Sequence, residues 1–129
     1  MKYILIFLFI IFSSITYADD RIKSDDIIVL IVDRNKTLSQ KTEELFKTKT
    51  VLSGINQQGQ QLFVVDINSP KNLKYARSLG ITHLPTAVRL RNFDGQWYKY
   101  ETFDPTKKTY TISNIFRFLG KIMPQPAST

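Results

Sequence analysis

Few side chains in this sequence have the types and the spacing that catalysis requires. The chain has no cysteine and a single histidine, His83. Without a thiolate it cannot carry out disulfide exchange by itself, and one histidine forms no zinc site without several well-placed carboxylates. There is no glycine-rich phosphate loop, and Asp66 has no evident partner for general acid–base catalysis. We therefore expect no catalytic residue, no cofactor and no metal ion.

The hydroxyl of Ser39 is the remaining candidate, as a substitute nucleophile or as a group that activates glutathione. The position of Thr37 to Ser39 just before a helical pattern favours a capping role instead, and Thr37 and Gln40 have the spacing of a capping box. We interpret His83 as a solvated loop residue; if it has a function, that function is a pH-sensitive contact rather than catalysis.

The clearest element boundaries lie in the stretch LGITHLPTAVRLRNFDG, which starts at Leu79. Gly80 can adopt the positive φ that ends a helix. Pro85 lacks an N–H group, so a new element starts after it. Thr86–Phe93 has the composition of a strand, and the Asp-Gly pair that follows is one that tight hairpin turns prefer.

The apolar patterns along the chain predict four strands and three helices in the order β-α-β-α-β-β-α. Ile27–Val32 is a continuous apolar run of mostly β-branched residues, typical of a central strand that is covered on both faces. Residues 48–61, with two glycines and four glutamines, are predicted to be a helix end followed by an exposed connection. The other expected strands begin at Leu62, Thr86 and Gln96, and the expected helices begin near Leu38, Ser69 and Ser113.

This order, with Val64-Val65-Asp66, Gly80-Ile81 and Leu84-Pro85-Thr86, resembles the thioredoxin family. The resemblance covers Ile27 to Met123 and implies an α/β fold with a central mixed sheet and helices packed on its faces. In that family the proline is cis and faces two catalytic cysteines, whose places would fall near Thr37–Leu38 and Gln40–Lys41. The resemblance therefore implies a thioredoxin-like domain that is redox-inactive.

The resemblance also implies a groove for a protein partner or an extended peptide, since active relatives hold polypeptide beside the proline. The residues expected to form it are Thr37, Leu38, Gln40, His83, Leu84 and Pro85. Arg89 and Arg91 alternate with apolar residues and so share one strand face. That face is either partly solvated and held by salt bridges to acidic neighbours, or a docking patch for an acidic partner.

The first eighteen residues have the anatomy of a secretory signal peptide. A basic start precedes an apolar run over residues 3–12, shorter than the roughly 20 residues of a spanning helix, and Ala18 suits cleavage. We expect a signal peptide over 1–18, a polar lead-in over 19–26, the domain over 27–123 and a disordered tail over 124–129. The mature protein would be periplasmic or secreted, without a stable membrane span.

The net charge of +7 favours an acidic partner or an anionic membrane surface, whereas no run of Lys and Arg suggests nucleic acid. Three functions remain open. The first is an exported, redox-inactive module that binds a protein or peptide in the cell envelope. The second is a structural subunit of an envelope, secretion or conjugation assembly. The least favoured is an enzyme that works with the cysteines of another protein.

Overall fold

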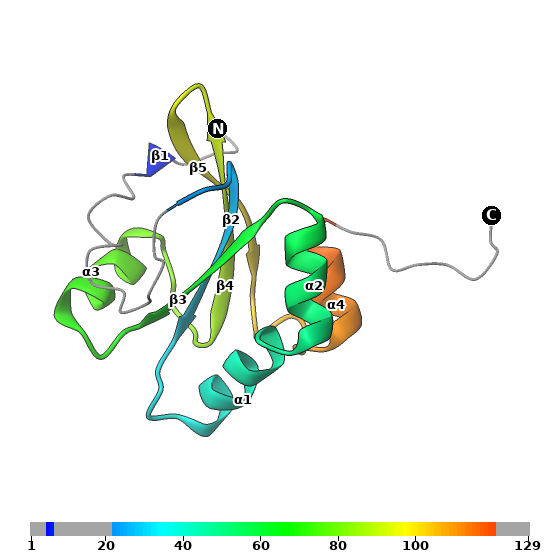
Figure 1. Cartoon of the computed structure of the whole chain (residues 1–129). Helices are drawn as coiled ribbons and strands as arrows, with labels where there is room; N and C mark the ends of the chain where they lie inside the picture. Colours follow the sequence, from blue (N-terminus) through cyan, green and yellow to red (C-terminus); the bar gives the residue numbers. More distant parts are fainter. Residues whose placement is uncertain (1–4, 7–21, 121–129) are drawn as a thin grey trace.

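The computed structural model describes residues 5–6 and 22–120 (Figure 1). Apart from Leu5 and Ile6, the predicted signal peptide lies outside the described residues, and so does the predicted tail. The strands are β1 (Leu5–Ile6), β2 (Asp26–Val32), β3 (Gln61–Asp66), β4 (Thr86–Phe93) and β5 (Gln96–Phe103). The helices are α1 (Thr37–Phe46), α2 (Lys49–Gln57), α3 (Pro70–Ser78) and α4 (Ile112–Phe118).

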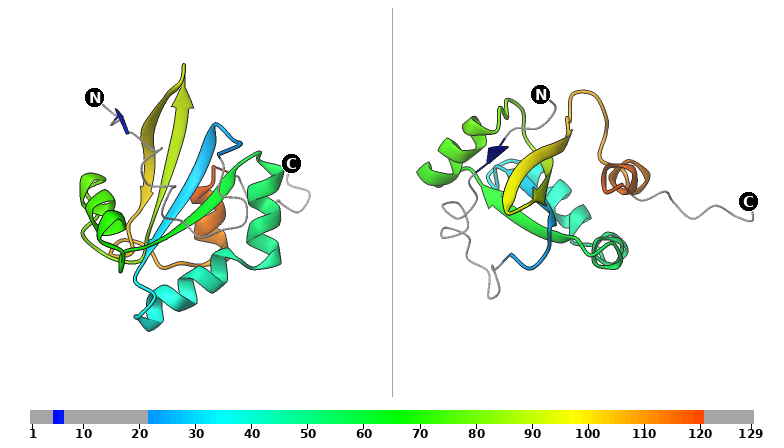
Figure 2. Two further views of the ribbon diagram at one scale, coloured as in Figure 1. Left: turned by 60° about the vertical axis from the view of Figure 1, so that its left-hand side comes forward. Right: turned by 90° about the horizontal axis from the view of Figure 1, so that it is seen from above.

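The strands form one mixed sheet in the order β1-β5-β4-β2-β3. β2 runs parallel to β3 and antiparallel to β4, and β4 and β5 form a hairpin. The hairpin turn is at Asp94 and Gly95, which both have positive φ, as the Asp-Gly pair predicted. Gly80 has positive φ just after α3, also as predicted. The hairpin extends beyond the helices at one end of the molecule (Figures 1 and 2).

Helices cover both faces of the sheet, with α3 on one face and α1, α2 and α4 on the other (Figures 1 and 2). β2 separates two apolar clusters because its side chains alternate between the faces. Ile27, Val29 and Ile31 belong to the cluster under α3, and Ile28, Leu30 and Val32 to the other. This confirms that the β-branched run is a central strand covered on both sides.

The prediction of an exposed connection over residues 48–61 is wrong, because most of this segment is α2. The Thr48 side chain caps the helix by accepting a hydrogen bond from the N–H of Val51. Val51 and Ile55 are buried one helical turn apart and pack into the core on the side of α4. The apolar positions were present in the sequence, but glutamines and glycines around them hid the helical period.

Three smaller boundary predictions also differ from the structure. Lys36, rather than Thr37, is the N-cap residue of α1, and Gln40 bonds to the carbonyl of Arg34 instead of completing a capping box. Thr111, rather than Ser113, caps α4, since its side chain accepts from the N–H of Asn114. β2 begins at Asp26, one residue inside the predicted lead-in. No helix among the described residues is long and apolar enough to cross a membrane.

Candidate functional site

The loop before β4 is held in place by Tyr110. The Leu84-Pro85 peptide bond is cis, and the Pro85 side chain is buried. The hydroxyl of Tyr110 donates a hydrogen bond to the Pro85 carbonyl at 3.0 Å. The Tyr110 ring stacks on Phe103, with 4.0 Å between centroids, and meets Phe46 edge-on at 5.7 Å. Tyr110 thus joins the Pro85 loop to α1 and to the end of β5.

A groove of about 280 Å³ lies beside Tyr110. One wall comes from α1 and the other from the segment that follows β5. Leu38, in the first turn of α1, lines the groove and is 59% exposed, the largest exposed fraction among the large apolar side chains of the described residues. The lining residues are Leu38, Lys41, Thr42, Leu45, Pro105, Lys108, Thr109 and Tyr110.

The start of α1 is fixed to the sheet by polar contacts. The Ser39 hydroxyl is buried and accepts a hydrogen bond from the N–H of Asp33 at 3.0 Å. Farther along the helix, Glu43 accepts two hydrogen bonds from the guanidinium of Arg34, which precedes α1, at 3.0 and 2.8 Å. Ser39 is therefore a structural residue, and its buried hydroxyl is inaccessible as a nucleophile.

The structure places the predicted groove residues in three different situations. Leu38 lines the groove, whereas Thr37 and Gln40 are exposed on α1 and do not line it. Pro85 is buried, so its ring is not offered to a partner, and it reaches the groove only through Tyr110. Leu84, which precedes it, is half-buried.

His83 is exposed on the same loop. Its ring Nδ1 lies 3.0 Å from the Thr82 hydroxyl. Hydrogen bonds from the Thr106 side chain and backbone, with Lys107 and His83 nearby, hold the pKa of Asp104 below its usual range. His83 therefore lies close to the segment after β5, although it does not line the groove itself.

Arg89 and Arg91 differ in burial. Arg89 is 6% exposed, and its Nη2 lies 2.8 Å from a carboxylate oxygen of Asp26. Its Nη1 donates to the carbonyl of Phe118 at 3.1 Å and lies 3.7 Å from Glu101. The expected acidic neighbours are thus present. Because it is buried among them, Arg89 is not available to a partner, and its assignment as a contact residue is corrected.

Arg91 remains accessible at the surface of the hairpin. Its guanidinium carbon lies 4.8 Å from the ring centroid of Tyr100 and 5.7 Å from that of Phe93. Within residues 22–120 it forms no ion pair. The part of the chain that the structure describes also has no group of three or more His, Cys, Asp and Glu residues that could hold a metal ion.

Sequence reasoning missed most of the groove. Lys41, Thr42 and Leu45 lie on the helix predicted to begin near Leu38, but their residue types did not mark them as groove residues. Lys108 and Tyr110 lie in an irregular segment without a period. Leu38 is the one lining residue that the resemblance had assigned to the groove.

Solved thioredoxin structures are similar to this chain. The solution structure of a thioredoxin from Thermus thermophilus gives a TM-score of 0.61 at 14% identity, over 74% of this chain and 71% of that one. A Trichomonas vaginalis thioredoxin gives 0.51 at 14% identity, over 72% and 78%. The Plasmodium falciparum thioredoxin gives 0.52 at 18% identity, over 91% and 94%. No protein-family model and no curated protein matches the sequence.

These similarities show a thioredoxin-like α/β fold, as predicted from the order of elements. The chain has this fold without any cysteine, so it has no thiol-redox activity of its own, because a thiolate is the nucleophile in disulfide exchange.

Proposed function

We propose that this protein is an exported accessory module of the cell envelope that binds a protein or an extended peptide without redox chemistry. The observation that carries the proposal is the groove between α1 and residues 105–110, in which Leu38 is 59% exposed. Leu38 exposes much of its apolar surface to water within a groove, and a partner that covered it would remove that surface from water, which is favourable.

The size of the groove supports a peptide rather than a cofactor. Its volume of about 280 Å³ lies just below the roughly 300–1,000 Å³ of small-molecule sites. One or two side chains of a polypeptide fit such a space. The walls are also fixed before binding, because Tyr110 connects the Pro85 loop, α1 and β5. A preformed site avoids part of the ordering cost that a mobile one incurs.

The N-terminal sequence supports export, through its basic start, its apolar run over residues 3–12 and the small residue Ala18. A bacterial periplasm and a eukaryotic secretory route both suit these features. The mature chain would meet its partner outside the cytoplasm.

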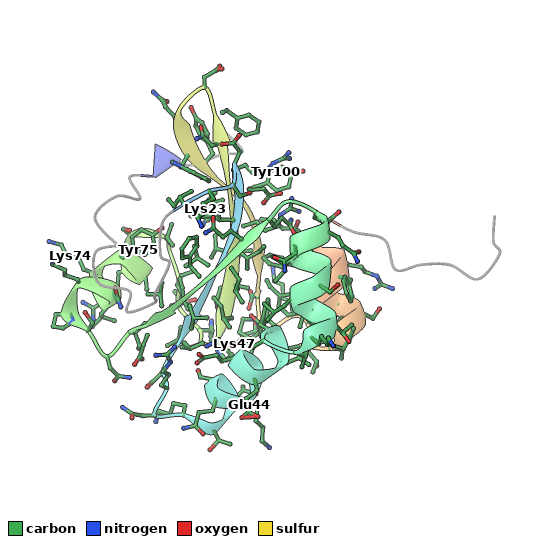
Figure 3. All side chains as sticks on the ribbon, in the orientation of Figure 1. Lys23, Glu44, Lys47, Lys74, Tyr75 and Tyr100 are labelled. Atoms are coloured by element: carbon green, nitrogen blue, oxygen red, sulfur yellow. The ribbon has the colours of Figure 1, made fainter. Side chains whose placement is uncertain are left out.

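The second candidate function, a structural subunit of an envelope assembly, is favoured by the β4–β5 hairpin. Phe93 and Tyr100 on this hairpin are 43% and 38% exposed, beside the guanidinium of Arg91. The hairpin lies at the opposite end of the molecule from α1, as the labelled Tyr100 and Glu44 show (Figure 3). The two candidate surfaces can therefore be altered independently.

Affinity capture from native envelope extract tests the first function. The bait is the tagged full chain, expressed with its own leader, and the test variant is Leu38→Asp. A carboxylate in the groove should abolish binding of an apolar segment, and we expect captured partner to fall at least about tenfold. Ser53→Asp is the matched control, because Ser53 is exposed on α2 and does not line the groove.

Loss of one partner with Leu38→Asp alone supports the binding module and identifies its partner. If both variants capture the same assembly as the wild type, the groove is not the binding site. Arg91→Glu then tests the structural-subunit function, since that change alters the hairpin and not the groove.

A further inference from the structure

Among the described residues that line the groove, both charged side chains are lysines. Lys41 comes from α1 and Lys108 from the segment after β5, so the two walls each contribute one positive charge. Leu38, Leu45, Pro105 and Tyr110 provide apolar surface along the same groove.

The two lysines are not neutralised within the described part of the chain. Glu43, on α1, is paired instead with Arg34 and Lys47, each at 2.8 Å. Lys41 and Lys108 are exposed and form no ion pair with a carboxylate of residues 22–120. The groove is therefore apolar along its length and positive at its sides.

We propose that the groove selects an acidic segment of a protein partner, in which one or two apolar side chains are flanked by Asp or Glu. This inference rests on the proposed binding function and specifies the chemistry of the partner. The apolar side chains cover Leu38 and Leu45, and the flanking carboxylates meet Lys41 and Lys108.

Charge complementarity is the physical basis of the selection. A neutral partner that covered the groove would remove part of the water around two ammonium groups without replacing it, which is unfavourable. Carboxylates on the partner replace that hydration with charge-assisted hydrogen bonds. Lysine stems can also lie along apolar surface while their ammonium groups stay at the rim.

An anionic membrane surface is the competing partner, since it also attracts lysines. The groove favours a polypeptide, because its apolar lining lies between two walls from separate segments, where a side chain can enter. A lipid surface would instead require apolar side chains on a protruding face. The membrane is therefore treated as an outcome of the test.

Peptide binding to the protein, expressed from its full sequence so that its own leader directs export and then purified, tests the proposal. The first probe is an eight-residue peptide with two central leucines and glutamates on each side, and the second has glutamines in place of the glutamates. Fluorescence anisotropy at low and moderate salt should show the glutamate peptide binding about tenfold more tightly than the glutamine peptide at low salt.

The test variant is Lys41→Gln with Lys108→Gln, which should lower affinity for the glutamate peptide about tenfold and weaken its salt dependence. The matched control is Lys71→Gln with Lys74→Gln. It removes the same charge from α3, on the opposite face of the sheet, where Lys74 is labelled (Figure 3). We expect the control to stay within about twofold of the wild type.

The outcomes separate this inference from the proposed function. Equal binding of both peptides, abolished by Leu38→Asp, would overturn acidic selection and leave the binding module intact. Sedimentation with anionic phosphatidylglycerol vesicles measures membrane binding of the same proteins. If neither peptide binds, or if Lys41→Gln with Lys108→Gln lowers only binding to these vesicles, the acidic segment is not the partner. Loss of binding in the α3 control as well would show that overall charge, rather than the groove, attracts the peptide.

Discussion

Arg89 and Arg91 lie two positions apart on one strand, yet Arg89 is buried and Arg91 is partly exposed. Arg89 lies among Asp26, Glu101 and the carbonyl of Phe118. Strand alternation correctly put both arginines on one face, but it does not indicate which other segments cover that face. That cover comes from Asp26, 63 residues earlier in the chain, and from the end of α4. A contact between such distant segments leaves no periodic signal in the sequence.

Tyr110 is the residue whose loss should affect the site most directly. We expect Tyr110→Phe to lower the free energy of unfolding at pH 7 by about 1 kcal/mol, because it removes the hydrogen bond to Pro85. Urea denaturation measures this change. Tyr75→Phe is the control, since the buried Tyr75 hydroxyl has no hydrogen-bond partner among the described residues and its removal should cost nothing at this pH.

The same two variants give a signed pH dependence. Burial raises the pKa of both Tyr75 and Tyr110 above the ordinary value of 10.0. The unfolded chain therefore releases these protons at lower pH than the folded chain. The contribution of the two tyrosines to the free energy of unfolding is fully present below pH 10 and is lost as the pH rises above it. Each variant should show a shallower alkaline loss than the wild type. Parallel alkaline curves for all three proteins would contradict this assignment.

At the scale of elements, the sequence predicted the strands better than the helices. Ile27–Val32 and the hairpin turn are local patterns, and the structure confirms both. α2 was missed because only Val51, Leu52 and Ile55 mark its apolar side, among glycines and glutamines. The groove was beyond prediction for a related reason. It forms where α1 meets an irregular segment about seventy residues later in the chain.

The ring of Phe116 explains why a glycine, Gly54, occupies the middle of α2. A Cβ atom at this position would overlap the ring of Phe116 and lie 2.9 Å from its Cζ atom. Alanine is favoured over glycine in a helix by about 1 kcal/mol, whereas overpacking a core costs about 1–3 kcal/mol. We therefore expect Gly54→Ala to be destabilising overall, by about 1 kcal/mol in thermal or urea unfolding.

Two further variants identify the cause of the Gly54 effect. Ser53→Ala, at the exposed neighbouring position, should leave stability unchanged or slightly raised. Phe116→Leu should cost less in the Gly54→Ala background than in the wild type, because the smaller side chain relieves the overlap. Additive costs would mean that α2 moves away from α4 instead.

At the scale of the whole molecule, β1 (Leu5–Ile6) adds an outer strand to the sheet. Among the residues whose side chains the structure describes, the two apolar clusters and the side chains packed against them extend from Ile22 to Leu119. Within the described residues, β1 pairs with Trp97 and Tyr98 at the outer edge of β5 (Figure 1). If residues 1–18 are removed on export, β5 becomes an edge strand while the helical layers stay intact.

This arrangement predicts a local rather than a global effect of leader removal. Residues 19–129 should unfold cooperatively, within about 1 kcal/mol of the full chain, because the described part of the leader is a two-residue strand at the edge of the sheet. Amide hydrogen exchange in Gln96–Phe103 should become faster, while exchange in the central strand Asp26–Val32 should stay slow in both proteins. A truncated chain that unfolds would show that β1 is an integral strand, and the signal-peptide prediction would then fail. An unchanged β5 would mean that its edge is protected by something other than β1.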